Sequence, residues 1–65
     1  MKIISCDNFD REGAIGDEHL VADNIANATQ AVVMCEALNA RFSGDHAQRY
    51  YRVVPDSHVL KEFKP

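Results

Sequence analysis

The first residues of the chain show the two-residue periodicity of a β-strand. Over residues 2–9, Ile4 and Cys6 alternate with the more polar Ser5 and Asp7. Side chains two positions apart lie on the same face of a strand, so one face of this segment is expected to be buried. The pattern predicts a first strand over residues 2–9.

The next segments predict a turn and a return strand. Residues 10–17 hold Gly13 and Gly16 among polar side chains, which is typical of an exposed loop. Residues 19–25 are expected to form a second strand, antiparallel to the first across this long loop. Apolar residues between positions 21 and 32 also lie at helical spacing, so a single long helix from about Glu18 is the alternative.

A helix is predicted over residues 28–42, where one apolar stripe recurs every three or four positions. The stripe consists of Ala28, Ala31, Val32, Cys35, Leu38 and Phe42. Val33 and Met34 lie beside it and widen it. Asn27 is expected to cap the first turn together with Gln30, and Gly44 to end the helix in a left-handed conformation.

Residues 49–54 are aromatic and β-branched, which predicts a third strand that ends at Pro55. Residues 58–60 form at most a short further edge segment. The element order is therefore β-β-α-β, which indicates an α+β fold. We expect a small two-layer domain in which a three-stranded antiparallel sheet of strand order 2-1-3 is covered by one helix.

Length and composition agree with a single domain over residues 1–65. The 65 residues are 46% hydrophobic and 26% charged, the balance of a folded globular chain rather than a disordered one. The longest apolar run, residues 31–35, is far shorter than the roughly 20 residues of a membrane-spanning helix. No secretory leader is apparent at the N-terminus, so we expect a cytoplasmic protein of a bacterial host cell.

The residues that could carry chemistry are few and scattered. His19, His46 and His58 lie far apart and show no metal-ligand spacing, and Cys35 belongs to the apolar stripe of the predicted helix. Cys6 and Cys35 are expected to be reduced, buried thiols; a disulfide between them would need Cα atoms within about 7 Å. We therefore expect no enzymatic activity, no metal and no cofactor.

Charge is unevenly distributed along the chain. The net charge is −3, but residues 1–40 hold seven acids and two bases, whereas residues 41–65 hold three acids and five bases. The acids before the helix are Asp7, Asp10, Glu12, Asp17, Glu18 and Asp23. They can form an ordinary solvated surface, or they can dock into a basic groove on another protein. A groove that normally holds DNA would make the chain a mimic of phosphates.

The segment Arg49-Tyr50-Tyr51-Arg52 combines cations and aromatic rings, as in proteins that bind single-stranded nucleic acid. Alternation along a strand, however, places the two tyrosines on opposite faces. One tyrosine is then expected to join the core, and the arginines to pair with the chain's own acids. We expect no direct binding of nucleic acid.

Four segments carry a resemblance to short bacterial and phage proteins. They are Asn8-Phe9-Asp10-Arg11-Glu12, Val21-Ala22-Asp23-Asn24-Ile25, Glu36-Ala37-Leu38-Asn39-Ala40-Arg41 and Tyr51-Arg52-Val53-Val54-Pro55-Asp56. As a whole string the chain resembles the small anti-CRISPR proteins of Pseudomonas phages and mobile elements, including inhibitors of the type I-C system. These inhibitors share no common motif, so the resemblance assigns no functional residue.

The resemblance implies a non-enzymatic inhibitor that binds a subunit of a type I CRISPR surveillance complex and blocks DNA binding or nuclease recruitment. The six acids before the helix are its predicted contact surface. The alternative is a small protein-interaction module without a role in defence. Either protein is expected to be a monomer or a weak homodimer, because a strand edge of a three-stranded sheet can pair with a second copy.

Overall fold

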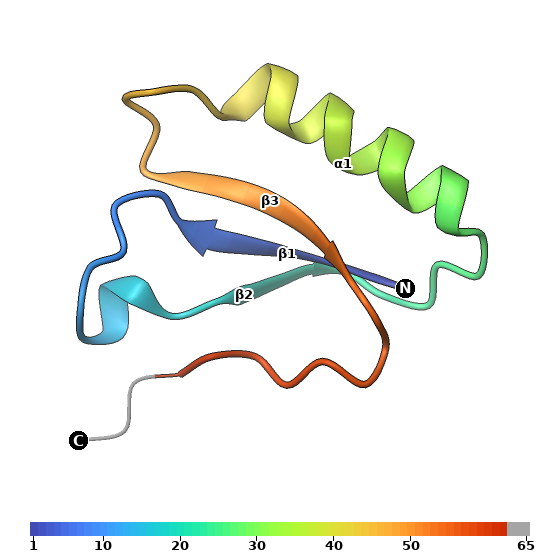
Figure 1. The fold of residues 1–65 in the computed structure, drawn as a ribbon, viewed down its shortest axis with the longest axis horizontal. Helices are drawn as coiled ribbons and strands as arrows, with labels where there is room; N and C mark the ends of the chain where they lie inside the picture. The colour runs from blue at the N-terminus through green and yellow to red at the C-terminus, as the bar shows by residue number, and fades with distance from the viewer. Residues whose placement is uncertain (63–65) are drawn as a thin grey trace.

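The computed structural model describes residues 1–62 and confirms the α+β fold (Figure 1). In chain order the elements are β1 (Lys2–Asp7), a single 3-10 turn η1 (Ala14–Gly16), β2 (His19–Ala22), α1 (Ala28–Phe42) and β3 (Arg49–Val54). Residues 19–22 thus form a strand, and the alternative of one long helix from Glu18 is wrong. The two N-terminal strands are shorter than predicted. β1 ends at Asp7, whose carboxylate binds the backbone of the following loop, and β2 ends at Ala22, two residues before Asn24 with its positive φ of 57°.

The sheet has the predicted order β2-β1-β3, and both strand pairs are antiparallel. On the central strand, Ile4 lies opposite Leu20 of β2 and Arg52 of β3. The pairing with β2 is irregular between Ile3 and Ile4, whereas the pairing with β3 is continuous over six residues. Because β1 lies between the other strands, Ile3 and Ile4 are fully buried on opposite faces of the sheet.

One face of the sheet is covered by chain without regular structure. Ile4, Cys6 and Val54 form a buried cluster, against which Tyr50 and Leu60 pack. Leu60 belongs to the C-terminal segment (residues 55–62), which runs beside β2 in Figure 1 and contains no strand. The end of this segment is held next to the start of β2 by a hydrogen bond from the Glu18 N–H to the Lys61 carbonyl, at 2.8 Å.

The bounds of α1 are those predicted, but only one of its two ends is capped as expected. The Asn27 side chain accepts a hydrogen bond from the backbone N–H of Gln30 at 2.9 Å. At the C-terminus, Ser43 is extended (φ −110°, ψ 167°) and its N–H donates to the Asn39 carbonyl. A left-handed stop at Gly44 is therefore wrong, since positive φ among the described glycines occurs at Gly13.

The helix lies along β3, an outer strand of the sheet, and contacts β1 to a lesser extent (Figure 1). This position makes the buried side of the helix narrow. Of the predicted stripe, Ala31 and Cys35 are buried, but Val32 and Phe42 are 44% and 60% exposed. Ala28 is exposed as well. The prediction that the whole stripe enters the core is therefore wrong for Ala28, Val32 and Phe42, because α1 packs mainly along β3 and only a narrow side of it is buried.

Both cysteines are free and buried, as predicted. Burial raises the pKa of each thiol, so Cys6 and Cys35 are protonated at neutral pH. In residues 1–62 the structure contains no helix that is both long and apolar enough to cross a membrane.

Candidate functional site

The β1–β2 loop (residues 8–18) carries most of the acids predicted to contact a partner. It begins directly after β1 and includes the turn η1 before the chain enters β2. Polar side chains of β1 and β3 form hydrogen bonds with residues near both ends of the loop. Its shape decides which of the acids face solvent together.

Asp7, the last residue of β1, organises the first half of this loop. Its carboxylate accepts hydrogen bonds from the backbone N–H groups of Arg11 (2.7 Å) and Phe9 (3.4 Å). The Arg11 guanidinium returns to the same carboxylate at 2.6 Å and lies over the Phe9 ring. These bonds, first among them those from the Arg11 side chain, hold the pKa of Asp7 far below its usual range.

The carboxylate of Asp7 is thus buried and neutralised by Arg11, with 3% of its side chain exposed. A group in this position cannot present charge to another macromolecule. Asp7, which was predicted as a contact residue, is buried and positions the loop, so it lies outside the exposed acidic surface.

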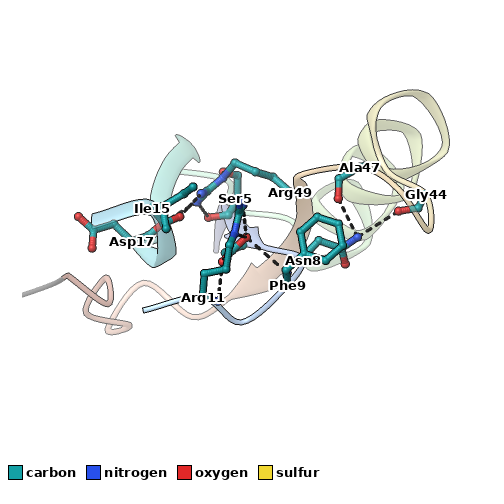
Figure 2. Close-up of polar contacts among 10 residues, drawn as sticks. Ser5, Asn8, Phe9, Arg11, Ile15, Asp17, Gly44, Ala47 and Arg49 are labelled. Atoms are coloured by element: carbon teal, nitrogen blue, oxygen red, sulfur yellow. Dashed lines mark hydrogen bonds and ion pairs between the residues drawn. The ribbon is translucent and has the colours of Figure 1, made fainter. Parts of the chain in front are cut away.

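Arg49 of β3 holds the second half of the loop (Figure 2). Its side chain crosses the central strand, where it donates to the Ser5 hydroxyl (2.6 Å) and the Ser5 carbonyl (2.8 Å). It then reaches the carbonyl oxygens of Asp17 (2.5 Å) and Ile15 (3.3 Å). One cation of β3 therefore ties the turn η1 and the residue after it to β1.

A third anchor joins the start of the loop to the connection between α1 and β3. The Asn8 side chain donates to the carbonyl oxygens of Gly44 (3.1 Å) and Ala47 (2.9 Å), as Figure 2 shows, while its N–H donates to the Gln48 carbonyl. The position of the loop thus depends on the connection between α1 and β3, which lies at least 36 residues away in the sequence.

Tight backbone packing completes the loop. Gly16 is buried, and a Cβ at this position would overlap the carbonyl oxygen of Arg11. Asp10 and Gly13 adopt positive φ values of 51° and 81°. These positive-φ residues turn the chain sharply, and the acids Asp10 and Glu12 of the turn are exposed.

The outer side of the loop borders an open hollow of about 500 Å³. Two segments line it, and all of the lining residues except Gly13 are charged: Asp10, Arg11, Glu12, Gly13, Asp17, Lys61 and Glu62. Asp10 and Glu12 are exposed, and Arg11 is already paired with Asp7. The hollow is therefore predominantly negative, and it gathers three of the six predicted contact residues: Asp10, Glu12 and Asp17.

Glu18 is not part of this negative surface, because it holds the C-terminal segment. Its carboxylate lies 2.8 Å from His58 Nε2, accepts the Lys61 N–H at 2.8 Å, and is approached by the Cys6 thiol at 3.9 Å. Burial opposes ionisation, but the hydrogen bonds from Lys61 and His58 outweigh it and lower the pKa of Glu18. Like Asp7, Glu18 is a predicted contact residue that is largely buried by contacts within the molecule.

Asp23 lies beyond the opposite end of β2, away from the β1–β2 loop. It is exposed, and its carboxylate accepts a hydrogen bond from the Asn24 side chain at 3.1 Å. The six acids therefore divide into a group at the hollow (Asp10, Glu12, Asp17), two structural residues (Asp7, Glu18) and one remote residue (Asp23).

The basic and aromatic segment of β3 does not form a stacking surface. Tyr50 lies opposite Cys6 and Tyr51 opposite Ser5, so the rings occupy opposite faces of the sheet. Tyr50 joins the buried cluster, as expected for one of the pair. Arg49 binds within the molecule through hydroxyl and carbonyl oxygens rather than through acids, and Arg52 is exposed.

A further observation bears on chemistry. Within residues 1–62, no group of three or more His, Cys, Asp or Glu side chains is arranged to hold a metal ion.

No family model, curated protein or solved structure matches the chain.

Proposed function

We propose that this protein is non-enzymatic and acts by binding another protein through the outer side of the β1–β2 loop. The observation that carries this proposal is the gathering of Asp10, Glu12 and Asp17 around one open hollow, on a loop whose conformation is fixed by Asp7, Arg11 and Arg49. A preorganised loop loses little conformational entropy on binding.

Charge defines the kind of partner. Asp10 and Glu12 are exposed, while the nearest guanidinium, that of Arg11, is already neutralised. The surface would repel a phosphate backbone and attract a cationic protein groove, with the largest gain in association rate and specificity. A subunit of a type I CRISPR surveillance complex has such a groove where DNA binds, which agrees with the resemblance to anti-CRISPR proteins.

The test compares two pairs of substitutions that each remove two negative charges. Asp10→Asn with Glu12→Gln alters the hollow, whereas Glu36→Gln with Asp45→Asn alters exposed acids outside it. We expect the first pair to weaken binding to a purified type I-C complex at least tenfold, about 1.4 kcal/mol, and the second to leave it unchanged. Association should also slow at high salt.

The same proteins are expressed in a CRISPR-immune host, and plaques are counted. We expect the wild-type chain to restore phage growth and the variant at the hollow to lose this effect. A wild-type chain that neither binds the complex nor restores plaques rejects the inhibitor. Equal binding by both pairs of variants rejects the acidic surface.

The second candidate is an interaction module with no role in defence. It is favoured by a different observation, the exposed apolar side chains of α1, which include Val33 and Phe42 at 59% and 60%. Recovery of host proteins other than CRISPR components in a pull-down, in amounts that Val33→Glu reduces and Asp10→Asn with Glu12→Gln does not, would support it.

A further inference from the structure

Large apolar side chains of α1 are also exposed outside its contact with the sheet, beside the polar Thr29 and Gln30. Val33 and Met34 are 59% and 43% exposed, and the 15 residues of the helix include only two charged side chains, Glu36 and Arg41. A helix with large apolar side chains on more than one side ordinarily packs against more than one neighbour. Here the sheet covers one side.

An apolar groove lies beside this helix. It has a volume of about 560 Å³ and runs between α1 and β2, with Ile3 of the central strand at its base. Its other walls are the apolar Val21, Ala22, Met34, Ala37, Leu38 and Phe42 and one charged residue, Arg41. The groove exists because α1 packs over β3 and β1, and in the described residues makes no contact with β2.

The dimensions of the molecule indicate that a large surface remains to be covered. Its radius of gyration is 12.0 Å, against about 10.8 Å for a compact chain of this length. Its accessible surface is 4598 Å², about a tenth more than the roughly 4,200 Å² of a monomer of this mass. Among residues 1–62, six hydrophobic residues are buried, whereas nine large hydrophobic side chains are exposed.

We propose that the groove between α1 and β2 is occupied by α1 of a second copy of this chain. In a two-fold dimer, each helix lies over the uncovered β2 of the other copy, and both helices are enclosed between the two sheets. The groove and the helix that fills it belong to the same face of the same chain, which is what an interface with two-fold symmetry requires.

Area and charge both allow this dimer. A standard interface buries about 800 Å² per partner. The molecule extends 35 × 27 Å in its two longer dimensions, so its broad face is large enough for an interface of that size. The helix is nearly neutral, while the negative hollow lies on the β1–β2 loop, which Figure 1 places at the other end of the sheet from the start of α1. The dimer therefore does not depend on the proposed function and leaves the hollow open.

The test is light scattering of the full chain over a concentration series, with Val33→Glu and the matched control Val59→Glu. Val33 lies on α1, the helix proposed to enter the groove of the other copy, whereas Val59 is 85% exposed and lies outside both α1 and the groove. Both variants add one negative charge to an exposed valine. We expect wild type and Val59→Glu to form dimers with the same dissociation constant, and Val33→Glu to raise that constant at least tenfold. Circular dichroism should show that both variants are folded.

A second measurement locates the interface. In a mixture of labelled and unlabelled chains, we expect intermolecular nuclear Overhauser effects between the Val33 methyls of one copy and Val21 of the other. A wild-type chain that is monomeric up to about 1 mM overturns the proposal and leaves the groove to a different protein. A dimer that Val33→Glu preserves also overturns it, since the copies would then pair through the edge of β2.

Discussion

The side chain of Asn39 pairs with the main chain of Tyr51 as a neighbouring strand would. Its Nδ2 donates to the Tyr51 carbonyl at 3.0 Å, and the Tyr51 N–H donates to its Oδ1 at 2.8 Å. One turn later, the Ser43 hydroxyl donates to the Arg49 carbonyl. The helix thereby covers the outer edge of β3, which would otherwise offer unpaired backbone groups to other chains.

We predict that Asn39→Ala lowers the free energy of unfolding by about 1–3 kcal/mol, because it leaves both backbone groups of Tyr51 without their partner. Gln30→Ala, on the exposed side of the same helix, should change it by less than about 0.5 kcal/mol. Urea unfolding measures both. Equal stabilities of the two variants would contradict the role of the edge contact. Asn39→Ala should also aggregate sooner, since it exposes the strand edge.

Arg49 supports the candidate site without touching a partner. We predict that Arg49→Met lowers the free energy of unfolding by about 2 kcal/mol, because Ser5 and the carbonyls of Ile15 and Asp17 lose a charged donor. Arg52→Met on the same strand is the control, since Arg52 is exposed. Amide hydrogen exchange should accelerate in the β1–β2 loop of the first variant alone. Unchanged exchange in that loop would show that Arg49 does not hold it.

Two glycines provide a test of the backbone packing in the loop. A methyl group at Gly16 would overlap the Arg11 carbonyl oxygen, whereas a methyl group at Gly44 would meet no atom within 4 Å. Gly16→Ala should therefore destabilise the protein by about 1–3 kcal/mol. Gly44→Ala should be neutral or stabilising by about 0.4–1 kcal/mol, because it reduces the entropy of the unfolded chain. Thermal unfolding of the two variants side by side decides the matter, and a fully stable Gly16→Ala would disprove the close approach.

Stability should fall as the solution becomes acidic. The pKa values of Asp7 and Glu18 are both lower in the folded protein than their ordinary values near 4. A lowered pKa means that the folded state binds protons less readily than the unfolded state. The stabilisation is therefore complete above about pH 5 and is lost as pH falls through the folded values.

Urea unfolding at pH 7, 5 and 3 measures this dependence. Glu18→Gln should be less stable than wild type at pH 7, and the difference should shrink toward pH 3, where the carboxylate of the wild type begins to be protonated. Asp10→Asn serves as the control, because Asp10 is exposed. A slope for Glu18→Gln that equals the wild-type slope would show that Glu18 does not bind the C-terminal segment through its charge.

The sequence by itself determined the elements and their order. The first strand and the helix carry their own periodicity, the third strand is marked by its aromatic and β-branched residues, and Asn27 marks the start of α1 through a contact only three residues away. Only residues 19–25 were open between a strand and a helix. The strand order followed from the short connections. One pairing within the loop was also accessible, since Asp7 and Arg11 lie four residues apart.

The tertiary structure alone decided which acids face solvent. Glu18 looks like Glu12 in the sequence, but its partner His58 lies 40 residues away, and Arg49 reaches Asp17 across 32 residues. It also decided which apolar side chains of α1 are buried. Periodicity shows that a helix has an apolar side, but the buried width depends on the elements it packs against. Because α1 packs mainly along the outer strand β3, Ala31 and Cys35 are buried, while Val33 and Phe42 are left to solvent or to a partner.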